Sequence, residues 1–155
     1  MRSLITVLAL AAALAGCASM PSMSSGNQGV PPGMNEKGEV IDSTKVEPGS
    51  GTKVMGIKGY QGEVFGKPAK NSKFTQLKPG MTDDQVRGLI GEPTVEASKM
   101  TAKAYIPFFK GSDRTRIMFV YKGQGRLVFA GGANDNYMTG KLLYIIHNPN
   151  ESGVL

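Results

Sequence analysis

The chain has 155 residues, with 18 lysines and arginines against 12 aspartates and glutamates, so its formal net charge is +6. This length fits a single domain, since domains typically hold ~100–200 residues. The single cysteine excludes a disulfide within the chain, and the single histidine excludes a metal site built from several imidazoles. The positive charge suits anionic headgroups or acidic protein surfaces, although scattered solvated charge is the commoner explanation. No segment resembles a nucleic-acid-binding motif.

The N-terminus has the pattern of an export signal. Arg2 precedes an apolar run over residues 4–14, which matches the charged and hydrophobic regions of a signal peptide. The run is too short to cross a bilayer, which takes roughly 20 apolar residues. The stretch that follows resembles the lipobox of bacterial lipoproteins: Leu14, Ala15, Gly16 and Cys17. An ordinary signal peptide followed by an incidental cysteine is the alternative.

The lipobox resemblance implies removal of residues 1–16 and covalent lipid on Cys17. The next residue is Ala18 rather than the aspartate that retains many such lipoproteins in the inner membrane. The resemblance therefore implies an outer-membrane protein that is lipid-anchored and faces the periplasm. Two or three acyl chains make such an anchor effectively permanent, because each buried methylene contributes about 0.8 kcal/mol. We expect no cofactor apart from this lipid.

The segment after the cysteine has the composition of a disordered tether. Sixteen of the thirty-five residues in 18–52 are glycine, proline or serine, and the few apolar residues follow no period. Such a segment buries too little surface to offset the entropy lost on ordering. Residues 17–52 are therefore interpreted as the lipidated N-terminus and linker, residues 53–70 as a strap or a hairpin, and residues 71–155 as the folded domain.

A short helix is predicted over residues 83–90. Thr82 is placed to cap it, and Gln85 completes a capping box. Gly91 suits the left-handed stop position, and Pro93 prevents continuation of the helix. The apolar positions form one stripe that must pack against a partner element: Val86, Leu89 and Ile90.

The rest of the chain predicts a sheet. Four segments rich in aliphatic and aromatic residues are expected to form successive antiparallel strands: 103–109, 115–121, 126–130 and 141–147. The first of these segments contains Pro107, which has no N–H to donate to a neighbouring strand, so this segment is expected to be an edge strand or to contain a bulge. The expected fold class is α+β, with a short helix or helix pair packed on an antiparallel meander of three to four strands. The helix would cover one face, and either residues 54–65 or a partner protein would cover the other.

The helix and its flanks carry a family resemblance. The pattern formed by Gly80, Met81, Thr82, Gln85, Val86, Gly91 and Pro93 resembles the signature of the SmpA/OmlA family, the BamE-like lipoprotein domain. The resemblance implies a small outer-membrane lipoprotein that belongs to the complex inserting β-barrel proteins and stabilises it without catalysis. The long linker, the absence of tryptophan and Pro107 depart from the family. The motif residues explain where a helix begins and ends, so the resemblance assigns no catalytic residue in this chain.

One surface is a candidate for binding. The predicted binding rim consists of Phe108, Lys110, Arg114 and Arg116, which cluster near one expected turn. Basic and aromatic side chains together suit anionic headgroups or an acidic protein. The alternative is that these charges are solvated strand edges, which discourage aggregation and need no partner.

The sequence therefore predicts a non-catalytic, lipid-anchored binding module that supports β-barrel assembly or envelope integrity through an envelope protein complex such as the barrel-assembly machinery. An envelope lipoprotein of the same fold that binds lipid, cell-wall material or another protein independently is the alternative. An enzyme is not expected, since His147 lies at the end of an apolar strand with no nucleophile motif in the chain. A hydrolase or a small-molecule binder would need an apolar pocket near His147.

Overall fold

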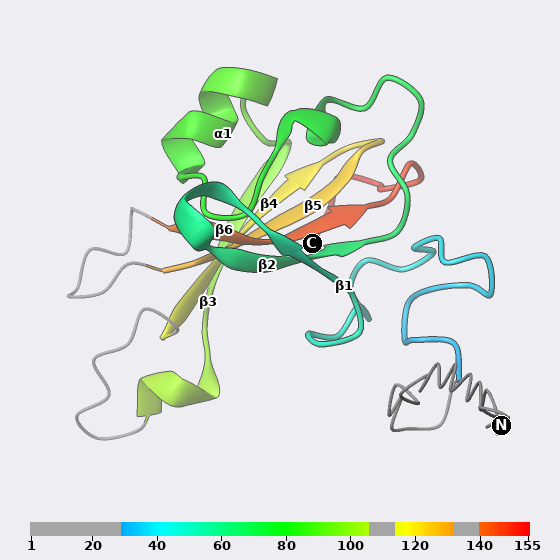
Figure 1. Cartoon of the computed structure of the whole chain (residues 1–155), viewed down its shortest axis with the longest axis horizontal. Helices are drawn as coiled ribbons and strands as arrows, with labels where there is room; N and C mark the ends of the chain where they lie inside the picture. Colours follow the sequence, from blue (N-terminus) through cyan, green and yellow to red (C-terminus); the bar gives the residue numbers. More distant parts are fainter. Residues whose placement is uncertain (1–28, 106–113, 132–139) are drawn as a thin grey trace, which may run out of the picture.

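The computed structural model describes residues 29–105, 114–131 and 140–155. These residues form a six-stranded sheet with one α-helix and three short 3-10 helices (Figure 1). The strands are β1 (Thr52–Met55), β2 (Gln61–Phe65), β3 (Val95–Met100), β4 (Thr115–Tyr121), β5 (Gly125–Ala130) and β6 (Lys141–His147). The helix is α1 (Asp83–Ile90), and the 3-10 helices are η1 (Ile57–Gly59), η2 (Lys73–Gln76) and η3 (Ala102–Tyr105).

The sheet is larger than expected and is mixed. Its strand order is β1-β2-β6-β5-β4-β3, and every neighbouring pair is antiparallel except β2 and β6, which run parallel. The expected helix on a meander of three to four strands is therefore wrong. The meander β4-β5-β6 exists, but three more strands extend it. Strands β1 and β2 form a hairpin within residues 53–70 and their margin, a segment interpreted from the sequence as a strap or a hairpin. Its membership of the sheet was not predicted, because both strands are short, β2 contains Gly62, and neither shows the alternation that marks a half-buried strand.

The strand expected over residues 103–109 is also wrong where the structure describes it. Residues 102–105 form η3, and residues 106–109 lie outside the described part. The strand that pairs with β4 is β3, directly after α1. Its sequence, Val95 to Met100, is mostly polar because β3 is an edge strand with four of its six residues exposed. A strand that is largely exposed at the edge of a sheet needs few apolar residues, so β3 lacks the apolar pattern on which the sequence prediction depended.

Helix α1 has the predicted bounds and the predicted cap. The Thr82 hydroxyl accepts a hydrogen bond from the Gln85 backbone N–H at 3.2 Å, and the Gln85 side chain accepts one from the Thr82 N–H at 3.0 Å. Gly91 ends the helix with a φ of +92°. The stripe is narrower than predicted, since Val86 and Ile90 are buried but Leu89 is 45% exposed. The helix therefore contributes Val86 and Ile90 to the core, one turn apart on the same side of the helix.

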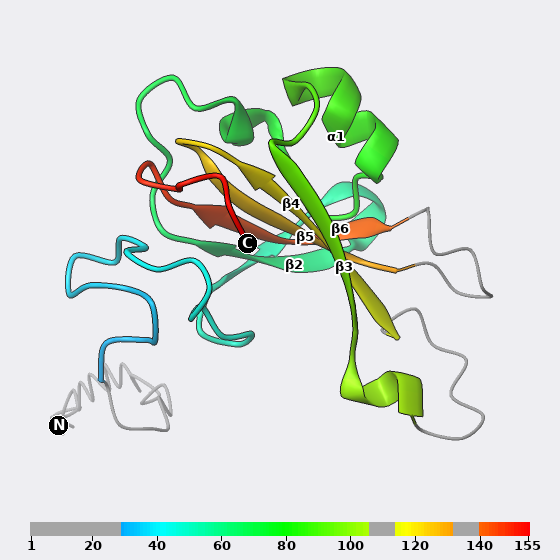
Figure 2. The ribbon, with the colours of Figure 1, turned by 180° about the vertical axis from the view of Figure 1, so that it is seen from behind.

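The main core fills the space between α1, η2 and one face of the sheet, the first face (Figure 2). Aromatic rings are packed at its centre, with the Phe119 and Phe129 centroids 4.7 Å apart and Phe74 edge-on to Tyr121 at 5.5 Å. The cluster comprises Phe74, Leu77, Val86, Ile90, Ile117, Phe119, Tyr121, Leu127, Phe129, Leu142 and Ile145. This burial supplies the tertiary support that an eight-residue helix lacks by itself.

The opposite face, the second face, is partly covered by residues 29–51 (Figures 1 and 2). Val40 is only 3% exposed and packs against Phe65 and Ile146. The Asn148 side chain donates a hydrogen bond to the Ser43 hydroxyl at 2.8 Å. This packing corrects the expectation of a disordered tether through residue 52. A few apolar residues suffice to order the segment because the sheet already presents a matching apolar surface.

The hairpin of β1 and β2 belongs to the sheet, so it does not form the cover that was expected from residues 54–65. Its glycines lie against Pro79, which is fully buried. A Cβ on Gly56 would lie 1.9 Å from the Pro79 carbonyl oxygen, and one on Gly62 would lie 2.6 Å from the Pro79 Cβ. Only glycine, which has no Cβ, allows the backbone of the hairpin to lie this close to Pro79.

Candidate docking surface

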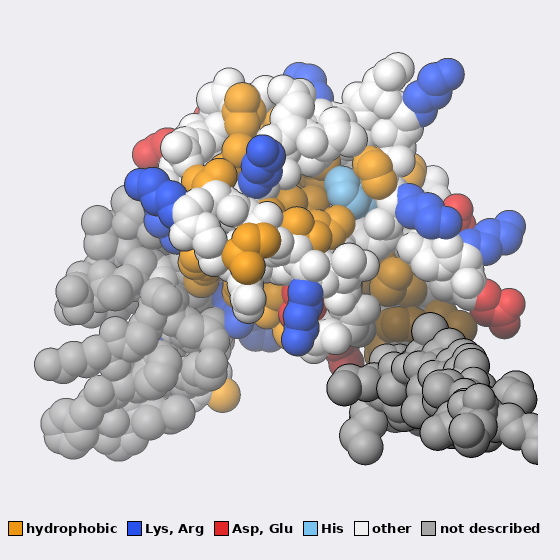
Figure 3. Space-filling view, in the orientation of Figure 1, with side chains coloured by type: hydrophobic (Ala, Val, Ile, Leu, Met, Phe, Trp, Pro, Cys, Tyr) orange, Lys and Arg blue, Asp and Glu red, His pale blue; other side chains and the backbone are white. Residues whose placement is uncertain are grey.

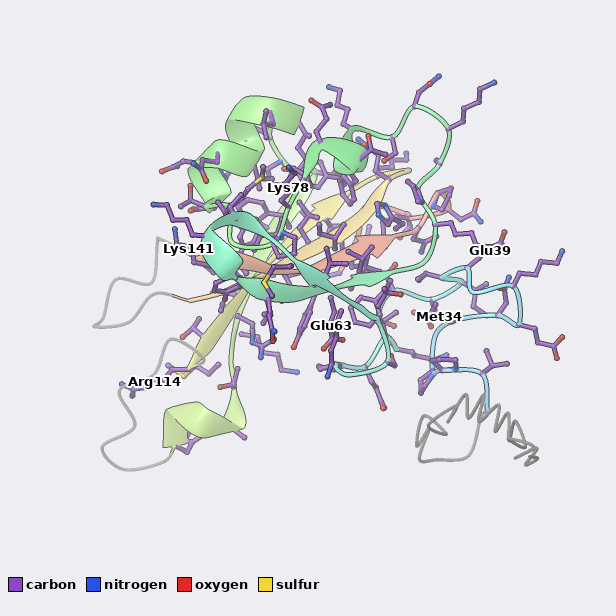
Figure 4. The ribbon with its side chains drawn as sticks, in the orientation of Figure 1. Met34, Glu39, Glu63, Lys78, Arg114 and Lys141 are labelled. Carbon is purple, nitrogen blue, oxygen red and sulfur yellow. The ribbon has the colours of Figure 1, made fainter. Side chains whose placement is uncertain are left out.

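The structure describes only part of the predicted functional residues. Leu14, Ala15, Gly16 and Cys17 lie outside the described residues, as do Phe108 and Lys110 of the predicted binding rim. Arg114 is exposed immediately before β4, and Arg116 lies in β4. Figure 4 shows Arg114 on the same side of the sheet as Glu63, away from α1. The described half of the rim therefore belongs to the second face.

The motif residues have structural positions. The Gly80 N–H donates to the Leu142 carbonyl at 2.8 Å, and the Leu142 N–H donates to the Met81 carbonyl at 2.8 Å. Gly80 has a φ of +87°, which favours glycine. Thr82, Gln85, Val86 and Gly91 start, pack and end α1, and Pro93 follows it. These contacts join the start of α1 to the start of β6 and leave no reactive group from the motif at a common site.

One row of side chains crosses the second face in register. Strand pairing aligns Glu63 with Tyr144, Tyr144 with Val128, Val128 with Met118, and Met118 with Ala97. Paired residues point to the same face of a sheet. Each of these side chains is partly exposed. We call the apolar part of this set the open row: Tyr144, Val128, Met118 and Ala97.

The open row is bordered by a covered row. The next row of the second face consists of Phe65, Ile146, Arg126 and Val120, all of which are buried. Residues 29–51 cover its β2 and β6 end through Val40. Arg126 is covered by the C-terminal segment, because its guanidinium donates to the Val154 carbonyl at 2.9 Å. Among the described residues the cover reaches the next row in part, since the Gly49 N–H donates to Glu63 at 2.8 Å and Val128 and Tyr144 pack against the cluster around Val40.

Basic side chains border the open row on its other side. Lys99 on β3 is paired with Arg116 on β4, and both belong to the second face. The Arg116 guanidinium carbon lies 5.2 Å from the centroid of the Tyr144 ring, within cation–π range. At the β1 end of the row, a hollow of about 190 Å³ is lined in part by Lys53, Glu63 and Tyr144. The arrangement is an apolar floor with Lys99 and Arg116 along one border and the oppositely charged Lys53 and Glu63 at the β1 end.

Arg126 forms a buried ion pair with Glu151. Its guanidinium donates to the Glu151 carboxylate at 3.0 and 2.9 Å, and both side chains are at least 94% buried. Burial raises the pKa of Glu151, but the hydrogen bonds from Arg126 and Ser43 outweigh it and lower that pKa below 4.5. The pair therefore joins β5, the C-terminal segment and residues 29–51. No local sequence pattern marks this pair, because Arg126 and Glu151 are 25 positions apart in the chain.

A second charged cluster lies on the first face. The Arg87 guanidinium lies 4.4 Å from the centroid of Phe119 and forms ion pairs with Glu92 and Glu96. The Tyr121 hydroxyl donates to the Gly91 carbonyl at 2.9 Å, and burial raises the pKa of Tyr121 to about 12. These contacts fix the end of α1 over β3 and β4. Their partners are used within the domain, so the cluster has a structural role.

His147 is buried on the first face. Its ring centroid lies 5.9 Å from that of Phe74, and its Nδ1 has no hydrogen-bond partner among the described residues. Burial lowers the pKa of His147 below 6.5. A cavity of about 260 Å³ borders this residue, smaller than the ~300–1,000 Å³ typical of ligand pockets. The surroundings therefore favour the neutral imidazole in a packing role.

Lowering the pH is expected to destabilise the protein through His147. Because its folded pKa is lowered, the unfolded chain binds a proton more readily than the folded chain. The stabilising contribution is complete above a pH of about 6.5 and is lost as the pH falls toward the folded pKa. Thermal melts at about pH 7.5 and pH 5 should show a fall in Tm that is smaller in His147→Gln. An equal fall in both proteins would contradict the assignment.

Within residues 29–105, 114–131 and 140–155, no group of three or more histidine, cysteine, aspartate or glutamate side chains is placed to hold a metal ion. The helices of the same residues include none that is long and apolar enough to cross a membrane. Basic side chains are spread over the surface shown in Figure 3 rather than gathered in one patch. Comparison of the chain with protein families, curated proteins and solved structures gives no match.

Proposed function

We propose that this protein is a lipid-anchored module of the bacterial outer membrane that binds an envelope protein without catalysing a reaction. The observation that carries the proposal is the lipobox-like stretch ending at Cys17, preceded by a charged residue and a short apolar run. A thioether-linked lipid at Cys17 would hold the domain on the periplasmic side of the membrane. The partly exposed face beside the covered row supports binding as the activity of the domain.

The fold brings the domain close to its anchor. Gly33 belongs to the segment that packs on the second face through Val40, and its carbonyl accepts hydrogen bonds from the N–H groups of Ile41 and Asp42 at 2.8 and 3.1 Å. Sixteen residue steps separate Cys17 from Gly33. A fully extended chain of that length spans at most ~55 Å. Gly33 therefore lies within this distance of the lipidated residue, and a partner has to lie within this distance plus the width of the domain.

The resemblance to the SmpA/OmlA family extends the proposal to a specific partner. It supports a role beside the machinery that inserts β-barrel proteins, and the motif that carries it spans Gly80 to Pro93. In the structure this motif joins α1 to β6 and forms the two ends of α1. The identity of the partner therefore depends on the sequence resemblance, whereas the anchor depends on Cys17.

Replacing Cys17 by serine tests the anchor. Wild-type protein should be recovered with outer membranes, and mass spectrometry of its N-terminus should show cleavage before an acylated Cys17. Cys17→Ser should lack the acyl mass and leave the membrane fraction, because its lipid supplied the binding energy. Ala18→Ser, next to the same bond, is the matched control and should stay acylated. An unmodified wild-type cysteine would overturn the proposal, and crosslinking that recovers no barrel-insertion subunit would remove the specific partner.

A further inference from the structure

Residues 29–51, here called the cover, form their backbone hydrogen bonds within themselves. Of the described backbone hydrogen bonds, those that involve this segment join two of its own residues, as when Asn35 donates to Glu39 and Ile41 donates to Gly33. Figures 1 and 2 both show the cover as a separate loop beside the sheet, on the side away from α1. Moving it off the sheet would therefore break no backbone pairing between the two, as far as the described residues show.

One apolar side chain supplies most of the packing between the cover and the second face. Val40 is 3% exposed and packs against Phe65 and Ile146. Met34 and Val46 pack against the same cluster but are only partly buried. A segment with a single buried apolar side chain has too small a core to stay folded alone. The cover is therefore ordered by the sheet and loses its order when it leaves the sheet.

Polar side chains complete the attachment. The Ser43 hydroxyl accepts a hydrogen bond from Asn148 at 2.8 Å and is also hydrogen-bonded to the Glu151 carboxylate. The Gly49 N–H donates to the Glu63 carboxylate at 2.8 Å. Segments with few buried contacts open locally at a lower free energy than the core of the same protein. The cover therefore meets the conditions for opening while the sheet stays folded.

Opening changes the length of chain between the anchor and the domain. With the cover docked, sixteen residue steps separate Cys17 from Gly33, and they span at most ~55 Å. With the cover released, the free chain extends to Thr52, the first residue of β1. Thirty-five residue steps then span at most ~120 Å. Release therefore about doubles the greatest reach of the domain, and it uncovers Phe65 and Ile146.

We propose that the cover is a releasable length of tether, which gives the anchored domain a short reach when it is docked and a long reach when it is released. This inference rests on the proposed function, because reach matters for a domain that is held at Cys17. A partner beyond the short reach is bound by the released state alone, so it shifts the equilibrium toward release.

Hydrogen–deuterium exchange of the acylated protein in detergent micelles, followed by mass spectrometry, tests whether the cover opens alone. Amides that are hydrogen-bonded within the cover, such as those of Ile41 and Asp42, should exchange at least tenfold faster than those of β5. Each opening exposes them to solvent while the strands remain paired. Equal exchange in the two regions would overturn the inference, because the cover would then open only when the sheet unfolds.

Two aspartate variants at neighbouring positions locate the attachment. Val40→Asp should speed exchange in the cover at least tenfold further and leave β5 within twofold, because a carboxylate is unfavourable in the buried site. Ile41→Asp is the matched control, since Ile41 is 63% exposed, and should change neither region more than twofold. If Val40→Asp does not fold, Ser43→Ala decides the result, with at least threefold faster exchange confined to the cover. An equal rise in the cover and in β5 would overturn the inference.

The reach itself can be measured by neutron reflectometry on a supported phospholipid bilayer that carries the acylated protein. Val40→Asp should give a protein layer that extends farther from the bilayer than the layer of Ile41→Asp. Identical layers would overturn the inference. Failure of the anchor is distinguishable, because a chain without acyl mass at Cys17 would form no layer at all, whereas its exchange pattern would be unchanged.

Discussion

Glu151→Gln is expected to lower the free energy of unfolding by about 3–5 kcal/mol, because it leaves the buried Arg126 charge without its counter-ion. Both side chains of the pair are at least 94% buried, and the carboxylate accepts two hydrogen bonds from the guanidinium. Glutamine keeps the size of the side chain, so the loss reports on charge rather than on a cavity. Urea unfolding followed by far-ultraviolet circular dichroism measures it.

Two further variants test whether the loss of stability in Glu151→Gln comes from an unpaired buried charge or only from a lost ion pair. The double variant Arg126→Met with Glu151→Leu should recover most of the stability, since apolar side chains of similar volume often replace a buried pair without loss. Glu92→Gln breaks the ion pair with Arg87 at a side chain that is 73% exposed, and should cost about 1 kcal/mol or less. Similar losses in Glu151→Gln and Glu92→Gln would contradict the interpretation.

Gly125→Ala is expected to cost about 3 kcal/mol, from backbone strain and overpacking together. Gly125 starts β5 with a φ of +133°, and a Cβ there would lie 1.9 Å from the Ile146 carbonyl oxygen. Because that oxygen belongs to the neighbouring strand, the clash is relieved only by separating β5 from β6. The same urea measurement gives the loss.

Gly123→Ala is the matched control in the same turn. Gly123 has a φ of +71°, and the nearest atom to its added Cβ would be 4.0 Å away. Its cost should be limited to the left-handed conformation, about 1–2 kcal/mol. If the two alanine variants are equally stable, the close approach of Gly125 to β6 is not important for the fold.

The sequence was sufficient to predict the elements that are marked by residues within or next to them. Helix α1 was predicted to the residue because its capping box and the glycine that follows it are encoded within ten positions. Strands β4 and β6 have the predicted bounds, and β5 begins one residue earlier than predicted. All three carry enough apolar residues to mark them as strands. Strand β3 lies at an edge, and its mostly polar sequence has no such signal.

The candidate surface could be predicted only in part. Arg114 and Arg116 were selected from their clustering in sequence, and both lie at the second face. Tyr144, Val128 and Met118 were not selected, because their alignment depends on the register of three strands. Register is fixed by the bulge between Val128 and Phe129 and by tertiary packing, neither of which a single sequence displays. The cover from residues 29–51 was missed for the same reason.

The parallel pairing of β2 with β6 also sets the order in which the chain can fold. Glu63 of β2 is aligned with Tyr144 of β6. The hairpin of β1 and β2 is synthesised first, but it can join the sheet only after β6 has been synthesised. Closing a loop of this length is entropically unfavourable, and such non-local pairing slows folding. Until β6 arrives, β1 and β2 form at most an isolated hairpin, which is marginally stable in water. Truncation before Lys141 should therefore remove the structure of residues 29–65 as well, even though that segment lies at the other end of the chain.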